Sequence, residues 1–317
     1  MKIPGHSRDQ FLKEQLEISL ASNGKMYKRV FTLMDMREDV VCYRQEVFLP
    51  EMQRLLDLGL QERTENGDII PKEIPVGETR KILMTHDEST FNANDGKRQM
   101  WIQNDSQSLR KKSKDRGIIV SEFLTPRGWL AVPEHISADG LPRRQATEYL
   151  EYGPDNYRSS EKIVQHTLEI AISIFERAFP GKQAVFLFDN ASRHNAYASD
   201  ALLVENMNLG PGGKQAILCD GFIHAKSLSP QSMVFPENYP DATLRGKAKG
   251  CKPTCSDSTS QKCCARQCLR LERDSQAQKG SLQEGIEACG HLVLFYPKFH
   301  CELNFIEFFW DAAKRHA

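Results

Sequence analysis

Apolar runs bounded by turn residues predict the strands of a buried sheet. They lie at residues 81–87, 117–124, 184–188 and 291–296, and residues 98–102 form a weaker candidate. Residues 125–128 are typical of a turn, after which 129–132 is expected to return as a hairpin. The run at 184–188 has no polar alternation, which is typical of a central strand covered on both faces.

Helix-like spacing of apolar residues fills most of the sequence between these runs. An amphipathic helix is predicted at 160–178 and another from about Asn304 onward, while residues 8–66 and 196–207 are also helix-like. Residues 220–280 differ, because they are rich in Pro, Gly, Ser, Lys and Cys and have weak periodicity. We interpret them as an insertion before the last strand.

The order of these elements predicts an α/β fold. Strands alternate with helices, which favours a mixed sheet with helices on both faces, and strand–helix–strand crossovers would make neighbouring strands parallel. We expect a helical N-terminal region at 1–75 and a larger domain at 76–317 that contains the insertion.

Composition excludes several classes of protein. Of the 317 residues 40% are hydrophobic and only 20 are Gly, which excludes a wholly disordered chain and a collagen-like polymer. No apolar run approaches the roughly 18–20 residues that span a bilayer, and residues 1–8 lack the apolar stretch of a signal peptide. We therefore expect a soluble, intracellular protein whose nine Cys are reduced. The 42 basic and 42 acidic residues balance, so net charge gives no evidence for nucleic-acid binding, although it can hide local patches.

Two acids follow predicted strands, and a third lies on the last helix. Asp87 and Asp189 stand at carboxyl ends of strands, the edge where open α/β sheets bind ligands, and Glu307 comes after the final strand. Three converging carboxylates can hold two Mg²⁺, because hard divalent cations prefer oxygen ligands. Two such metals stabilise the attacking and leaving oxygens of an in-line phosphoryl displacement.

Each of these acids also has an ordinary structural interpretation. An acid after a strand is often solvated or caps a helix. Asn304 and Glu307 have the spacing of a capping box, which alone would account for Glu307. Three nearby acids, Glu88, Glu302 and Asp311, are alternative candidates for the same site.

Three sequence blocks resemble the signatures of a known family. They are THDESTF at 85–91, FDNASRH at 188–194 and YPKFHCELNFIEFFW at 296–310. In this order they are similar to the Asp-Glu-Ser, Asp-Asn-Ala-x-x-His and Leu-Asn-x-Ile-Glu-x-x-Trp blocks of mariner-like DDE transposases. The resemblance covers roughly residues 80–317 and points to the long-insert eukaryotic branch of that family.

The resemblance implies a fold, a site and a reaction. The fold would be RNase H-like, and Asp87, Asp189 and Glu307 would be catalytic residues that bind Mg²⁺ or Mn²⁺. They would support nicking of transposon-end DNA, followed by transfer of the freed 3′-hydroxyl to a target strand. Asn190 and His194 would lie behind the carboxylates or contact DNA. The expected partners are transposon-end and target DNA and no membrane, with nuclear localisation; a homodimer stays an open expectation.

The chain also departs from compact members of the family. Asp189 and Glu307 are 118 positions apart, Phe305 stands where compact members often have Pro, and ten residues follow Glu307. We therefore expect a truncated member. The alternative function is a catalytically inactive, transposon-derived DNA-binding or interaction protein.

A basic segment precedes the strand at 117–124. It contains Arg110, Lys111, Lys112, Lys114 and Arg116. These residues are candidates for phosphate contacts, which give sequence-independent affinity for DNA. An ordinary solvated loop and a nuclear-import signal are the alternatives.

The insertion contains a cluster of cysteines in its most basic part. Residues 244–273 hold eight basic and two acidic residues, so this stretch is also a candidate to track DNA. Its cysteines are Cys251, Cys255, Cys263, Cys264 and Cys268. The first four are candidates for a structural Zn²⁺ site, although free thiols fit the spacing better.

Histidines offer a further, weaker candidate for metal chemistry. His86, His194, His291 and His300 are scattered along the chain, and their spacing gives little support to a zinc hydrolase.

Overall fold

The computed structural model describes residues 37–60, 73–92, 117–151, 159–208, 210–223, 229–250, 266, 269–270 and 272–316. It divides into two compact units. One comprises Met1–His194 with Leu282–Ala317, and the other is Asn195–Ser281. The weaker strand at 98–102 and the helices expected before residue 37 lie outside the described residues.

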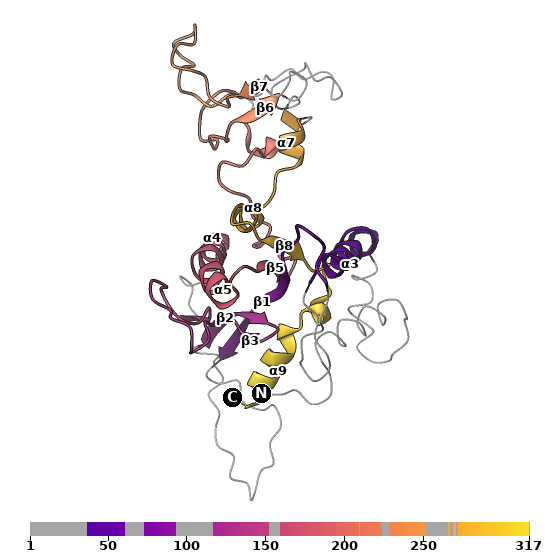
Figure 1. The fold of residues 1–317 in the computed structure, drawn as a ribbon. Coiled ribbons are helices and arrows are strands. Elements are labelled where there is room, and N and C mark those ends of the chain that lie inside the picture. Colours follow the sequence, from indigo (N-terminus) through magenta and orange to yellow (C-terminus); the bar gives the residue numbers. More distant parts are fainter. Residues whose placement is uncertain are drawn as a thin grey trace, which may run out of the picture. The chain divides into compact units, whose positions relative to one another are not determined.

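A six-stranded mixed sheet forms the centre of the first unit (Figure 1). Its strands are β1 (Lys81–Asn92), β2 (Gly117–Thr125), β3 (Gly128–Trp129), β4 (Glu148–Glu151), β5 (Gln183–Phe188) and β8 (Leu292–Phe295). The order is β3-β2-β1-β5-β8, with β4 also paired to β2. β2 is antiparallel to β1, whereas β1, β5 and β8 are parallel to one another. The predicted fold class, an RNase H-like mixed sheet flanked by helices, is confirmed.

The predicted strands appear near their expected positions. β1 continues past Asp87 to Asn92, because its polar second half pairs with β2 in antiparallel register from Thr85↔Leu124 to Asn92↔Gly117. The hairpin strand β3 is short, although the Leu130 amide still donates to the Phe123 carbonyl at 2.8 Å.

Helices cover the two faces of this sheet (Figure 1). The helix predicted at 160–178 is continuous through α4 (Ser160–Gln165), the π-helical segment η3 (His166–Ala171) and α5 (Ile172–Ala178). It begins where the Ser159 side chain accepts from the Lys162 amide at 3.4 Å, as an N-cap does. On the other face lie α2 (Glu38–Cys42), η2 (Tyr43–Phe48) and α3 (Leu49–Asp57). The chain returns through α8 (Ser281–Ala288), η6 (Cys301–Leu303) and α9 (Ile306–His316).

Alternation along the strands separates two hydrophobic cores. On β1, Ile82 and Met84 pack with α4 and α5, while Leu83 packs with η2 and α3. On β5, Phe186 joins the first core and Leu187 the second. Because successive side chains of a strand point to opposite faces, these buried residues fix the direction of every side chain that follows them.

The second unit has a small core of its own. It contains η4 (Val204–Asn206), the antiparallel pair β6 (Gly221–Ile223) and β7 (Ser229–Gln231), and α7 (Arg273–Gln276). Its buried residues are Leu202, Val204, Met207, Leu218, Met233 and Leu269. This unit includes the described part of the segment expected as an insertion at 220–280. The boundary expected at residue 75 stays a prediction.

The prediction of a helix at residues 196–207 is wrong. Only the single turn η4 forms there. The Leu202 amide donates to the Gln278 side-chain oxygen at 2.9 Å instead of to a carbonyl one helical turn earlier. Leu202 and Val204 are both buried at a spacing of two, so tertiary contacts outweigh the helix-like pattern.

Among the described helices, none combines the length and the apolar composition needed to cross a bilayer.

Aromatic packing anchors α9 against the sheet. Ile306 and Trp310 are buried and form a cluster with Leu124 of β2. The Trp310 ring stacks on Trp129, with ring centroids 5.5 Å apart, and meets the edge of Phe91 at 6.2 Å. Offset and edge-on aromatic contacts of this kind add to the free energy gained by burial.

We expect Trp310→Ala to lower the free energy of unfolding by about 3–5 kcal/mol, because it removes the largest buried side chain of α9. Phe308→Ala is the matched control on the same helix, since 39% of Phe308 is exposed, and it should cost less than about 1 kcal/mol. Urea unfolding followed by circular dichroism measures both values. Equal losses would contradict the anchoring role of Trp310.

Candidate functional site

The pairing of β1 with β5 brings two of the predicted carboxylates together. The strands run parallel, and the last residues that pair are Thr85 and Leu187. Two residues further along stand Asp87, within β1, and Asp189, directly after the end of β5, on the face that Leu187 shares. The third carboxylate, Glu307, lies in the first turn of α9, directly after the buried anchor Ile306.

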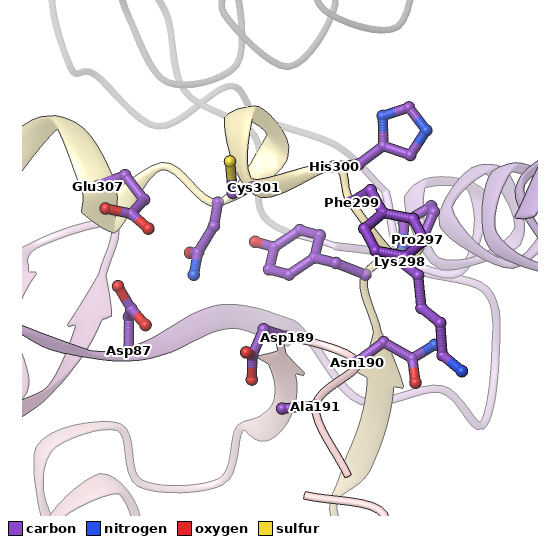
Figure 2. A pocket seen from close by; sticks show the side chains of 12 residues that line it. Asp87, Asp189, Asn190, Ala191, Pro297, Lys298, Phe299, His300, Cys301 and Glu307 are labelled. Carbon is purple, nitrogen blue, oxygen red and sulfur yellow. The ribbon is translucent and has the colours of Figure 1, made fainter. Parts of the chain in front are cut away.

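All three carboxylates line one pocket of about 260 Å³ (Figure 2). The side chains of Asp87 and Glu307 point toward one another, and Asp189 lies beside them on the next strand end (Figure 2). The pocket is lined by Asp87, Asp189, Asn190, Ala191, Tyr296, Pro297, Lys298, Phe299, His300, Cys301, Asn304 and Glu307. The Lys298 side chain extends away from Asp87 and Glu307 (Figure 2).

Asn304 ties the start of α9 to β1. Its Nδ2 donates to the backbone carbonyl of His86 at 3.3 Å, next to Asp87 in the chain. Its Oδ1 is buried and has no hydrogen-bond partner in the part of the chain that the structure describes. The capping box considered for Asn304 and Glu307 is therefore absent: the amide of Glu307 bonds the Asn304 carbonyl, and the amide of Asn304 bonds the Cys301 carbonyl. Capping does not account for Glu307.

The alternative acids lie outside the pocket lining. Glu88 points to the opposite face of β1 from Asp87 and accepts from Arg193 at 2.8 Å. Glu302 pairs with His300 at 2.7 Å and is half exposed. Asp311 is exposed, one turn after Glu307 on α9.

The pocket favours positive charge. Burial raises the pKa of Asp87 well above its ordinary value, and the nearby charges of Glu307, Glu88 and Asp189 raise it further. Like charges confined together repel one another, and a cation placed between them removes that repulsion.

Glu307 experiences the same environment less strongly. Burial raises the pKa of its carboxyl, the charge of Lys314 opposes the shift, and Asp311 and Asp189 add to it. Because Lys314 belongs to the same helix, it stays near Glu307 wherever α9 is docked.

Asp189 is held in its ionised form by His194. Burial would raise the pKa of Asp189, but the hydrogen bond and charge of His194, together with the charge of Arg193, outweigh it and lower that pKa. His194 Nδ1 contacts the Asp189 carboxylate and lies 3.0 Å from the Asp189 carbonyl oxygen. Both partners accept hydrogen bonds, so Nδ1 carries a proton. His194 is 1% exposed, which favours a role in holding Asp189 over contact with DNA.

The donor set fits a hard divalent cation. Three carboxylates and the buried amide oxygen of Asn304 are the oxygen ligands that Mg²⁺ and Mn²⁺ prefer. The spacing of Asn304 and Glu307 in the sequence predicts only a capping role for Asn304. Its position between the last strand and Glu307 is the one sequence feature that points to a second role as a metal ligand.

The structure does not bring the other predicted site residues together with the carboxylates of the pocket. Arg110, Lys111, Lys112, Lys114 and Arg116 lie outside the described residues. Cys251, Cys255, Cys263 and Cys264 do too, so the structure does not bear on a zinc site in the insertion. His291 and His300 are separate from one another: His291 accepts from the Ala184 amide at 3.3 Å, and His300 contacts Arg44 and Glu302.

Comparison with known proteins finds likeness only among solved structures. No family model matches the chain, and no curated protein matches it. Similar structures include a Mos1 transposase paired-end complex with left transposon end, at 12% identity and a TM-score of 0.25 over 62% of this chain and 56% of that one. The Mos1 mariner paired end complex with Mn gives 15% identity and 0.26 over 61% and 55%. The complex with Mg gives 12% and 0.24 over 61% and 56%.

The matched region spans little more than half the length of those chains. Identities and TM-scores this low say nothing about the chemistry of this chain, which must be inferred from its own residues.

We expect Asp87→Asn to raise the melting temperature in metal-free buffer at about pH 7. The folded state raises the pKa of Asp87, so stability is lost as pH rises from the unfolded value, roughly 3.9, through the folded one. The side chain of Asn at position 87 does not ionise, so the variant does not lose stability as the pH rises. At about pH 4 the two proteins should melt at similar temperatures, because the carboxyl is then largely protonated. A variant that melts lower at neutral pH would refute the repulsion argument.

The turn that borders the pocket contains a strained residue. The His300 amide bonds the Pro297 carbonyl at 3.3 Å, and Phe299, the third residue of this turn, has φ 65°. This is the position at which a type II turn favours glycine.

Replacing Phe299 by Gly should therefore give a protein about 1 kcal/mol more stable than replacing it by Ala. The same pair of substitutions at Phe308, inside α9, should reverse that order by about 0.5–1 kcal/mol. Chemical denaturation of the four variants tests both. A more stable Ala variant at position 299 would show that the turn tolerates a side chain there.

Proposed function

We propose that this chain is a DDE-type DNA endonuclease and strand-transfer domain that uses two divalent metal ions. The observation that carries the proposal is the convergence of Asp87, Asp189 and Glu307, from two strand ends and one helix, on a single pocket. Their order in the chain and their neighbouring residues also resemble the three blocks of mariner-like DDE transposases, in the long-insert branch.

The proposed metal ligands differ in how the chain prepares them. Asp189 is held ionised by His194, so it is ready to bind a cation at neutral pH. Asp87 and Glu307 have raised pKa values, so a cation must displace protons to recruit them fully. Mg²⁺ or Mn²⁺, when bound, would activate a water or the 3′-hydroxyl of DNA for attack and would stabilise the charge of the leaving oxygen.

DNA is the proposed substrate. A phosphodiester is an electrophile that divalent cations held by these carboxylates would bind, and Lys298 in the pocket lining is the kind of residue that contacts phosphate. The basic residues at 110–116 and 244–273 would extend the contact along the DNA backbone. A nuclear location and a homodimer bound to two transposon ends belong to the same proposal.

The test is nicking, in Mn²⁺, of a supercoiled plasmid that carries the DNA from both sides of the gene. We expect the full chain to nick it and Asp87→Ala, Asp189→Ala and Glu307→Ala each to reduce nicking to background. Glu302→Gln is the matched control, because Glu302 is an acid of the same segment outside the pocket lining, and it should nick normally.

Two results would count against this function. Nicking that survives Asp189→Ala would remove the pocket as its source. Binding of the plasmid by the unsubstituted chain without any nicking would favour the catalytically inactive DNA-binding protein instead.

A further inference from the structure

A second cluster of metal-ligating side chains lies on the other face of β1. His86 and Glu88 flank Asp87 in the sequence, so the alternation of the strand turns both of them away from the pocket and toward the core of α4 and α5. His194 reaches them from the loop after β5. One ligand atom from each of the three side chains lies within 4.8 Å of the others.

The cluster is buried. His86 and His194 are each 1% exposed, and the Glu88 side chain is 6% exposed. The His86 ring packs on Phe123 and Phe188, with centroids 4.6 and 5.1 Å apart, and its centroid lies 5.8 Å from that of His194. Polar atoms enclosed in this way cost free energy unless they are satisfied.

Each of the three side chains has a hydrogen bond or ion pair with a residue outside the cluster, which fixes its orientation. His86 Nε2 lies 2.9 Å from Ser121 Oγ, Glu88 Oε2 accepts from Arg193, and His194 Nδ1 contacts Asp189. Metal-binding histidines are characteristically held by such a second bond on the ring nitrogen that does not bind the metal.

The direction of these hydrogen bonds decides which ring nitrogen of each histidine can bind a metal. Because His194 Nδ1 carries its proton toward Asp189, Nε2 is the nitrogen that offers a lone pair, and a bound cation takes the place of any proton there. That atom is buried and has no hydrogen-bond partner among the described residues.

The His86 ring is oriented by a chain of hydrogen bonds. His166 Nε2 lies 2.6 Å from the Ala146 carbonyl and therefore donates to it, while His166 Nδ1 lies 3.5 Å from both Ser121 Oγ and the Glu148 carboxylate. With a neutral His166 ring, Ser121 Oγ donates to His166 Nδ1 and accepts from His86 Nε2. The lone pair of the neutral His86 ring is then on Nδ1.

We propose that His86, Glu88 and His194 bind one transition-metal cation of the Zn²⁺ class. Two imidazole nitrogens and a carboxylate oxygen are a ligand set for Zn²⁺, Co²⁺ and related ions, whereas Asp87, Asp189 and Glu307 offer only carboxylate oxygens. Ligand atoms at roughly 2.0–2.2 Å from a shared tetrahedral ion lie about 3.4 Å apart, so a small movement of the side chains completes the site.

The site is coupled to the pocket through one residue. A cation on His194 Nε2 makes a metal–histidine–carboxylate series that ends at Asp189, an arrangement that fixes the orientation of both side chains. The site does not rest on the proposed nuclease function, because neither Asp87 nor Glu307 takes part in it.

The test is titration of metal-free protein with Co²⁺ in excess Mg²⁺, followed by visible absorption. Nitrogen ligation in a four- or five-coordinate site gives strong d–d bands, and oxygen ligands in octahedral geometry give weak ones. We expect one strongly absorbing Co²⁺ per chain, with affinity lowered at least about tenfold in Glu88→Gln and His194→Gln. Asp87→Asn, on the opposite face, and His316→Gln, at an exposed histidine, should leave the affinity unchanged.

A second readout uses the unsubstituted protein, so it does not depend on the folding of a variant. In ¹⁵N-histidine NMR spectra, Zn²⁺ should shift the ring nitrogens of two histidines, and Mg²⁺ should shift neither. Co²⁺ bands with thiolate charge transfer that persist in Glu88→Gln would place the ion at cysteines and overturn the proposal. Absence of any strong band, or of the histidine shifts, would overturn it too and identify an ordinary buried hydrogen-bonded cluster.

Discussion

The parallel pairing of β1 with β5 is the constraint on which the pocket depends. The register fixes which residues of the two strands lie side by side, and the buried residues on each strand fix which face they point to. A slip of one residue in either strand would turn its carboxylate to the opposite face. The aromatic and aliphatic residues that prevent such a slip, Phe186 and Leu187 among them, therefore contribute to the site without touching it.

Two effects oppose one another at this sheet edge. Packing gathers carboxylates that repel each other, as the raised pKa values of Asp87 and Glu307 indicate. The free energy that holds them together comes from elsewhere: from the two cores and from the aromatic cluster under α9. A site that is unfavourable by itself is typical of the trade-off between stability and activity.

Local patterns in the sequence were enough to predict the sheet and the acidic residues at the ends of its strands. The unbroken run at 184–188 predicted a central strand, and the order of strands and helices predicted the mixed sheet. The helix expected at 196–207 failed because contacts with Gln278, far along the chain, decide its backbone bonds. Asn304 was interpreted as a cap because its true partner, the carbonyl of His86, is visible only once the strand is in place. The cluster of His86, Glu88 and His194 was missed for the same reason: spacing along the chain does not reveal how a loop folds back.

The position of Glu307 has a consequence for the order in which the protein is made. Asp87 and Asp189 belong to strands synthesised early, whereas Glu307 follows Asp189 by 118 positions. A ribosome that has completed β5 must still translate the whole second unit before α9 emerges. During that interval the nascent chain holds only two of the three carboxylates that line the pocket, so the complete pocket forms at the end of folding and does not guide its beginning.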